Sequence, residues 1–420
     1  MTTVRTTKPE ASAPVAETEP LGSYVGAYFQ RVRGGEMGAL PAVAGLIVLC
    51  TVFTILRPVF LTPGNFANLL PQGAAVTVIA MGLVFVLLLG EIDLSAGYTS
   101  GVCASLLAIM LADYGLPWYA AILVAVVAGS VIGLTLGSLV AKVGIPSFVV
   151  TLAAFLAFQG VVLLLIKGGT IISIQDPTIL AISNKFLSPS LGWICFALAI
   201  AAYAAVQLLR RRSRRARGLA SDPLSLVLLR VVALAVLTGA AVYILNLERS
   251  RNILIVSLKG VPIVVPIVVI LLVLLTFVLK RTRYGLHIYA VGGNREAARR
   301  AGINIDAIRI SAFVLCSTMA AVGGILTASR NNSVDANTGG SNVLLYAVGA
   351  AVIGGTSLFG GKGRILDAVL GGAVVAVIDN GMGLMGYSSG VKFIVTGLVL
   401  LLAAGVDALS RRRATTAGLR

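Results

Sequence analysis

The sequence predicts an all-α, polytopic integral membrane protein with about twelve transmembrane helices (about 10–12) and with both termini in the cytoplasm. Three observations lead to this fold class. Of the 420 residues, 58% are hydrophobic and only 12% are charged. Apolar runs of about 20 residues, enough to cross a bilayer, recur along the chain after Leu40. The lysines and arginines lie in short clusters between these runs.

The apolar runs follow one another closely, so no sizeable soluble domain is expected between them. They predict spans at 40–57, 70–90, 95–112, 118–140, 147–166, 191–209, 226–247, 262–280, 308–327, 343–359, 364–380 and 391–408.

The positions of the basic clusters predict the topology. With the N-terminus inside, three clusters fall on the cytoplasmic side, at Arg210–Arg217, Lys280–Arg309 and Arg411–Arg413. The membrane domain then covers residues 40–410. It lies between a cytoplasmic, disordered N-terminal tail (1–39) and a cytoplasmic tail (411–420). The longest outer segment, about 167–190, has the turn residues and short β-prone runs of a small cap or lid.

The net charge of +17 does not predict nucleic-acid binding, because the cations are distributed as the positive-inside rule requires. The four cysteines and the single histidine, His287, lack the spacing of metal ligands. We therefore expect no metal, no cofactor and no covalent chemistry in this chain.

The stretch GGTSLFGGKG, residues 354–363, looks at first like a phosphate-binding loop. A Walker A loop has glycine where Thr356 stands, and a serine or threonine where Gly363 stands. The favoured interpretation is that small residues allow close backbone packing inside the membrane. A loop that contacts a partner subunit is the alternative.

Carboxylates at the ends of apolar runs are candidates for a transport path. Glu91 and Asp93 follow the second run, in LLLGEIDLSAG, and Asp379 with Asn380 ends another. Ionisable groups at membrane depth usually face a bundle interior or a water-filled path. The other interpretation of Glu91 and Asp93 is an interfacial turn and helix cap.

The basic loop between the spans ending at 280 and beginning at 308 carries a short helix signal. Residues 289–293 are expected to form a turn, and Asn294 is expected to cap a helix that has Glu296 in its first turn. Gly302 then ends that helix, which has the size to dock in a groove of another protein.

Four motifs carry a resemblance to a known family. They are GEIDLSAG, YAVGGNREAARRAGINI, AVIGGTSLFGGKGRI and DNGMGLMGYSSGVKFIVTGLVLLLAAGVD, in this order. In these motifs the chain resembles the inner-membrane permease subunits of bacterial ABC sugar importers, of the ribose/xylose branch. The resemblance covers about 40–166 and 262–410.

The resemblance implies an EAA-x-x-x-G coupling loop, within about 281–307, that docks on an ATPase subunit. The matching positions and their neighbours are Gly292, Gly293, Asn294, Glu296, Ala297, Ala298 and Gly302. The proline of the fuller family motif is absent from INIDAIRI. The resemblance further implies a permease homodimer in the bacterial cell membrane, two copies of the ATP-binding subunit and an extracytoplasmic sugar-binding protein.

The middle of the chain, about 191–260, is an insert with two candidate spans around a basic loop, which resembles the xylose-type permeases. We therefore expect xylose or a related pentose as the substrate. Its cluster Arg210–Arg217 either binds the headgroups of membrane lipid or fixes the orientation of the chain.

The predicted mechanism is alternating access driven by ATP hydrolysis on the partner. Polar side chains that can bind sugar hydroxyls are nominated for the path: Glu91, Asp93, Gln159 and Asn380. Asn65, Asn68 and Gln72 are expected at its outer mouth. The alternative class is an ion- or proton-coupled secondary transporter with Glu91, Asp93 and Asp379 as relay.

Overall fold

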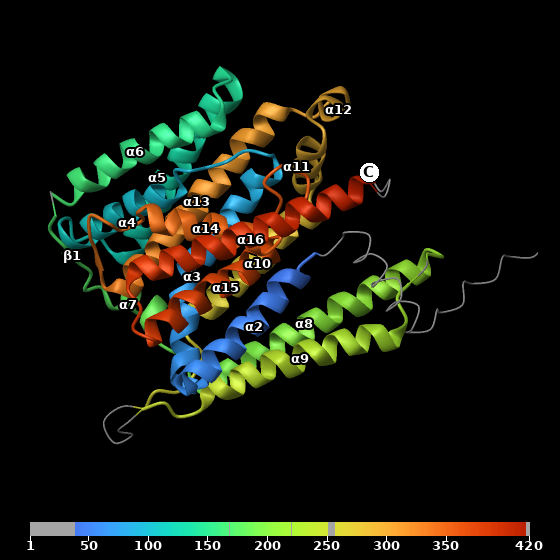
Figure 1. Cartoon of the computed structure of the whole chain (residues 1–420), viewed down its shortest axis with the longest axis horizontal. Coiled ribbons are helices and arrows are strands. Elements are labelled where there is room, and N and C mark those ends of the chain that lie inside the picture. Colours follow the sequence, from blue (N-terminus) through green and yellow to red (C-terminus); the bar gives the residue numbers. More distant parts are fainter. Residues whose placement is uncertain (1–37, 168, 220, 251–256, 417–420) are drawn as a thin grey trace, which may run out of the picture.

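The computed structural model describes residues 38–167, 169–219, 221–250 and 257–416. Helices run roughly side by side along one long axis (Figure 1). The predicted tail at 1–39 lies almost wholly outside the described residues.

A helix occupies the position of every predicted span. Eight helices in the described parts of the chain are long and apolar enough to cross a membrane. They are α3 (Pro63–Leu88), α5 with its π-helical end (Trp118–Val143), α6 (Ser147–Leu165), α8 (Pro189–Ala216), α9 (Leu224–Asn246), α10 (Val264–Arg281), α13 (Ile305–Asn331) and α15 (Ile365–Leu384). The other four predicted spans correspond to shorter apolar helices. They are α2 (Leu40–Leu56), α4 (Ala96–Ala112), α14 (Ser341–Ile353) and the first part of α16 (Ser389–Thr416).

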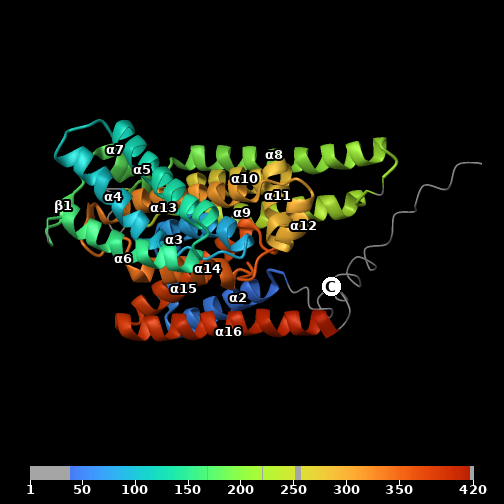
Figure 2. The same ribbon diagram turned by 90° about the horizontal axis from the view of Figure 1, so that it is seen from above.

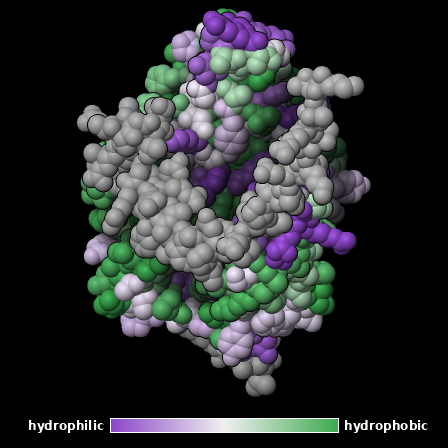
Figure 3. Space-filling model, turned by 90° about the vertical axis from the view of Figure 1, so that its right-hand side faces the viewer, coloured by the Kyte–Doolittle hydropathy of each residue, from purple (hydrophilic) through white to green (hydrophobic). Residues whose placement is uncertain are grey.

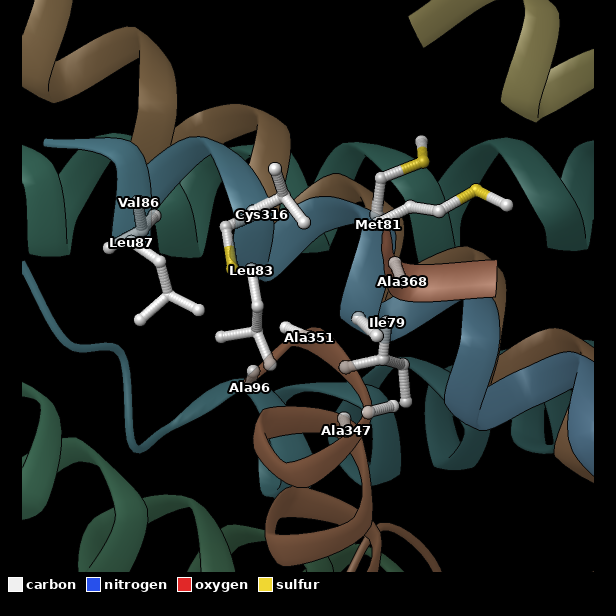
Figure 4. Close-up of a cluster of buried hydrophobic side chains, with 14 of the residues drawn as sticks. Ile79, Met81, Leu83, Val86, Leu87, Ala96, Cys316, Ala347, Ala351 and Ala368 are labelled. Carbon is white, nitrogen blue, oxygen red and sulfur yellow. The ribbon is translucent and has the colours of Figure 1, made fainter. Parts of the chain in front are cut away.

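Helix α3 lies at the centre of the bundle. Every residue from Thr77 to Leu89 is buried, and α13, α14, α15 and α10 all pack against it. Figure 4 shows side chains of α3 meeting small residues of its neighbours, among them Ala347, Ala351 and Ala368. Small residues bring the neighbouring backbones close, which is how helices gain contact when lipid supplies no hydrophobic drive.

The helices α8 and α9 of the predicted insert form an antiparallel pair at one side of the bundle (Figure 2). Only 6% of the residues in each apolar window are buried, against 67% for α3. The pair therefore adds to the edge of the membrane domain and not to its core.

One end of the bundle is rich in arginine and lysine, and we call it the basic end. It carries Lys142, the end of α8, the short helices α11 (Arg283–Gly293) and α12 (Arg295–Arg300), and Lys362. The positive-inside rule predicts that this end lies in the cytoplasm.

At the opposite end, the predicted cap is a folded segment. It contains β1 (Ile172–Ser173), which pairs antiparallel with β2 (Ser333–Val334), and α7 (Pro177–Asn184), which packs on the end of α13. The amide side chain of Asn184 donates to the Ser329 carbonyl at 2.6 Å.

The predicted span at 95–112 begins inside the bundle. After α3 the chain turns back through the non-helical residues 89–95, which we call the inner arm, and only then starts α4. Glu91 contacts Arg309 on α13, whereas a Cβ at Gly324 of α13 would overlap Ser100 of α4. Arg309 and Gly324 are about 22 Å apart along α13. Because Arg309 lies at the basic end and the first turns of α4 pack at Gly324, α4 starts far from the basic end.

Helix α14 is the counterpart of α4. Its 13 residues span only about 20 Å, and the chain reaches it from the opposite end through residues 332–340, the outer arm. The starts of α4 and α14 meet, because a Cβ at Gly97 of α4 would lie 3.0 Å from the Cβ of Leu344 of α14. The predicted span 343–359 was thus too long, since Gly354 and Gly355 end the helix.

We predict that close packing of α15 on α14 depends on Gly371. A Cβ at this position would overlap the Ala350 carbonyl oxygen, whereas one at Gly160 of α6 would meet no heavy atom within 4 Å. Gly371→Ala should destabilise the protein by about 1–3 kcal/mol through overpacking. Gly160→Ala, the matched control, should be neutral or stabilising by up to about 1 kcal/mol. Thermal unfolding in detergent measures both, and equal stabilities would contradict the packing.

Candidate functional site

The first candidate site lies at the basic end, where the loop between α10 and α13 folds against the end of α3. Hydrophilic residues gather at the top and in the centre of this end (Figure 3). The loop forms two consecutive helices, α11 and α12, separated by Asn294.

The turn predicted at 289–293 is wrong, because these residues complete helix α11. Ile288 and Val291 bury one face of α11 against the core, as helical spacing allows. Gly292 lies so close to the end of α3 that a Cβ there would overlap the Leu88 carbonyl oxygen. Gly293 follows it as the exposed last residue of α11.

Helix α12 has the ends that the sequence predicts. The Asn294 side chain accepts a hydrogen bond from the Ala297 amide at 2.9 Å, which satisfies one free donor of the first turn. Gly302 follows the helix with φ of +80°, a left-handed conformation that suits glycine. Ala298 is buried, and Glu296 and Ala297 are exposed.

The charges of α12 are presented outward. Glu296 pairs with Arg300 at 3.2 Å and with Arg299 at 3.8 Å, and all three side chains are exposed. Exposed pairs of this kind contribute little to stability. They leave a charged helix available on the surface.

Glu91 connects this loop to the core. Its carboxylate is 7% exposed and accepts hydrogen bonds from Arg295 at 2.6 Å and from Arg309 at 2.7 Å. Arg295 also donates to the Leu89 carbonyl at 3.2 Å. One carboxylate on the inner arm thereby binds the first residue of α12 and the second turn of α13, and we call this group the Glu91 clamp.

Asp93 has a different role in the same arm. It is fully buried, and its Oδ1 accepts from the Ser95 amide at 2.9 Å and from the Ser95 hydroxyl at 2.6 Å. It therefore holds the turn that leads into α4, but it lies inside the bundle and not at an interface, and the first turn of α4 has no side-chain cap.

The glycine loop at 354–363 joins α14 to α15 and lies between α3 and α11. The Gly361 amide donates to the Leu88 carbonyl at 2.8 Å, and the Tyr289 hydroxyl donates to the Gly363 carbonyl at 2.7 Å. The Ser357 amide closes the loop by donating a hydrogen bond to the Lys362 carbonyl at 2.9 Å. The glycines thus bring backbone against backbone beside the Glu91 clamp.

The second polar cluster lies toward the opposite end, between α3 and α15. Asn65 and Asn380 exchange side-chain hydrogen bonds at 2.8 and 3.0 Å, and both are buried. Asn380 also donates to Gln72 at 3.1 Å, and Gln72 donates to Asp379 at 2.6 Å. Lys392 of α16 completes the cluster by donating to Asp379 at 3.0 Å.

The four residues predicted for the path therefore lie in three places. Glu91 and Asp93 belong to the inner arm, Asn380 belongs to the cluster on α15, and Gln159 is half-buried on α6. Asn65 and Gln72, expected at an outer mouth, do join Asn380, while Asn68 is exposed on α3.

The sequence reasoning did not find Arg309 and Lys392 as partners of these carboxylates. A usable signal existed for Lys392, which is a charge inside the predicted apolar run 391–408. No group of histidine, cysteine, aspartate or glutamate in the described residues is arranged to hold a metal ion.

Comparison with known proteins gives a consistent set of relatives. Residues 65–404 match the family model described as the permease component of the branched-chain amino acid transport system. The xylose transport system permease protein of Escherichia coli is 36% identical over 92% of this chain and 95% of its own. The xylose transport system permease protein of Haemophilus influenzae is 32% identical over 84% of this chain and 91% of its own. The ribose import permease protein of Escherichia coli is 30% identical over 90% of this chain and 96% of its own. No solved structure matches the chain.

We predict unequal contributions from the two arginines of the Glu91 clamp. The side chain of Arg309 is 15% exposed and that of Arg295 is 47% exposed, so solvent screens the second pair more. Arg309→Gln leaves a buried carboxylate with one partner and should lower the free energy of unfolding by about 3 kcal/mol. Arg295→Gln should lower it by about 1 kcal/mol or less.

Chemical or thermal unfolding of each variant and of Glu91→Gln provides the measurement. In a double-mutant cycle, Arg309→Gln should cost much less when Glu91→Gln is already present. An additive result would show that the two side chains do not interact energetically.

Proposed function

The chain belongs to the permease-component family matched above, and we propose that it is the membrane permease of an ABC importer for xylose or a closely related pentose. The observation that carries this proposal is the 36% identity over 92% of the chain to a xylose transport permease. The chain is a multi-pass protein of the bacterial inner membrane. It is not an enzyme, since ATP hydrolysis belongs to a separate subunit.

The partners follow from the same membership. An ATPase subunit supplies energy, and an extracytoplasmic binding protein delivers the sugar. We further propose that two copies of the permease pair and bind two ATPase subunits, so that the path closes around the sugar from both sides.

Helices α11 and α12 are the proposed docking surface for the ATPase. The exposed face of α12 carries Glu296 and its arginines, and the neighbouring segments expose large apolar side chains, Leu286 at 68% and Phe359 at 76%. An apolar anchor beside a charged helix is typical of protein interfaces. The absent proline of the family motif does not prevent the helix from forming.

The Glu91 clamp is the proposed route by which ATPase motion reaches the membrane. A displacement of α12 pulls on Arg295, which is bound to Glu91 and to the Leu89 carbonyl. Because the inner arm leads directly into α4, a shift of Glu91 is passed to a helix that starts inside the bundle. The glycine loop moves with it through Gly361.

An ion- or proton-coupled transporter is the weaker explanation. It needs Glu91 free to exchange an ion, but two arginines hold this carboxylate. The named relatives are also permease proteins of xylose transport and ribose import.

Reconstitution tests the function directly. The permease is placed in liposomes with and without its ATPase and binding protein, and uptake of labelled xylose is measured with and without a proton gradient. We expect uptake only with ATP and both partners. Uptake that follows the gradient and ignores ATP would overturn the importer assignment.

Two substitutions test the docking surface. Glu296→Arg reverses the charge presented by the exposed side chain of residue 296. In Gly302→Pro, the proline cannot adopt a φ of +80°, and it lacks the amide hydrogen that Gly302 donates to the Arg299 carbonyl. Both variants should enter the membrane, but ATP hydrolysis should no longer drive uptake.

The matched controls are a milder change at Gly302 and a charge change outside the docking surface. Gly302→Asn tolerates a left-handed conformation, and Arg212→Gln removes an exposed charge from the end of α8. Both should keep coupled transport near the wild-type level. If Glu296→Arg and Gly302→Pro bind ATPase and transport normally, the docking assignment fails.

A further inference from the structure

An ion pair deep in the membrane region is not explained by the coupling mechanism. Asp379 and Lys392 lie on α15 and α16, and their side chains remain 31% and 21% exposed. Asp379 is about 21 Å along α15 from the basic end, roughly two thirds of the way across a hydrocarbon layer of about 30 Å.

A partly exposed ion pair at this depth restricts what its open side can face. Charges turned toward lipid tails are costly, and intramembrane charges face a bundle interior or a water-filled path. Lys392 is near the start of α16 and could extend toward the membrane surface. Its ammonium instead turns to Asp379.

The surroundings of Asp379 supply the functional groups that bind polyols. Gln72 of α3 donates to it at 2.6 Å, and Lys392 of α16 donates to it at 3.0 Å. The Tyr346 ring of α14 lies 6.4 Å from that of Phe393, the residue after Lys392. Four helices therefore supply a carboxylate, a cation, an amide and aromatic rings.

The cluster has a buried part and an accessible part. The buried residues hold the helices together, and only the accessible residues can contact a ligand. Asn65 and Asn380 are buried and satisfy each other, so they tie α3 to α15. Gln72, Asp379 and Lys392 form the accessible edge. Asn380 acts as a positioning residue, because its bond to the Gln72 oxygen turns the Gln72 amide nitrogen toward Asp379.

We propose that Gln72, Asp379 and Lys392 form a subsite for the hydroxyls of a neutral pentose on the outer part of the translocation path. This proposal rests on the proposed function. A pair of neighbouring hydroxyls can donate to Asp379 and accept from Lys392 or Gln72, and the apolar face of the sugar can pack on Tyr346. Binding is weak and reversible because the sugar must replace existing bonds among these side chains.

Transport by the reconstituted importer is the first test. Asp379→Asn and Lys392→Gln should each lower xylose uptake about tenfold, the loss expected from one charge-assisted hydrogen bond, while binding-protein-stimulated ATP hydrolysis is retained. Asp113→Asn, the same kind of substitution at the exposed C-terminal end of α4, is the control and should transport normally. Uptake near the wild-type level in both charge variants would overturn the subsite.

Water access is the second test and assumes nothing about the sugar. Gln72→Cys is made in a Cys50→Ala, Cys195→Ala background and treated with a membrane-impermeant cationic thiol reagent from the side of the binding protein. We expect modification that xylose slows during turnover. Val236→Cys, at a 64% exposed apolar position of α9, should stay unmodified.

The outcomes separate the two proposals. If Gln72→Cys is as inert as Val236→Cys in an importer that carries xylose, the subsite is wrong and the proposed function stands. If the wild type carries no pentose under ATP, the proposed function fails, and the labelling result alone decides whether this edge lines a water path.

Discussion

Backbone polar groups inside a bilayer must find partners within the protein, and this constraint governs the whole arrangement. Two segments leave helical structure within the bundle, the inner arm at 89–95 and the outer arm at 332–340. Most residues of the two arms are buried or half-buried, although Gly90, Asn332 and Asn337 are exposed. Both arms are also bonded locally: the Ile92 carbonyl accepts from Thr151 at 3.1 Å, and the Asp335 amide donates to Thr338 at 2.9 Å. The arms are possible only because full-length helices surround them.

The same constraint explains where the charges lie. Glu91 is buried but has two arginines, so its burial is compensated, and the compensation links three elements at the basic end. Asp379 is compensated by Lys392 and Gln72 but stays accessible, so it can exchange these partners for a ligand. Two carboxylates that look alike in the sequence therefore differ in their accessibility, and we propose different roles for them, transmission for Glu91 and substrate contact for Asp379.

Glycine gives the bundle its close contacts, which is the interpretation that the sequence favoured for residues 354–363. The 354–363 loop resembles a phosphate cradle because both structures need backbone without side chains. In the protein, the Gly361 amide is bonded to the Leu88 carbonyl, and Gly292 faces the same carbonyl from α11. The helices α8 and α9, poor in such contacts, remain at the edge of the bundle.

Local signals in the sequence determined the helix positions, the cap of α12 at Asn294 and its end at Gly302, because apolar length, side-chain capping and a left-handed residue act within a few neighbours. The sequence alone did not place the start of α4 inside the bundle, or show that Arg309 binds Glu91 and Lys392 binds Asp379. These pairs are separated by 218 and 13 residues along the chain. Only the packing of α13 and α16 decided them, since a buried charge selects its partner by proximity in space and not by sequence distance.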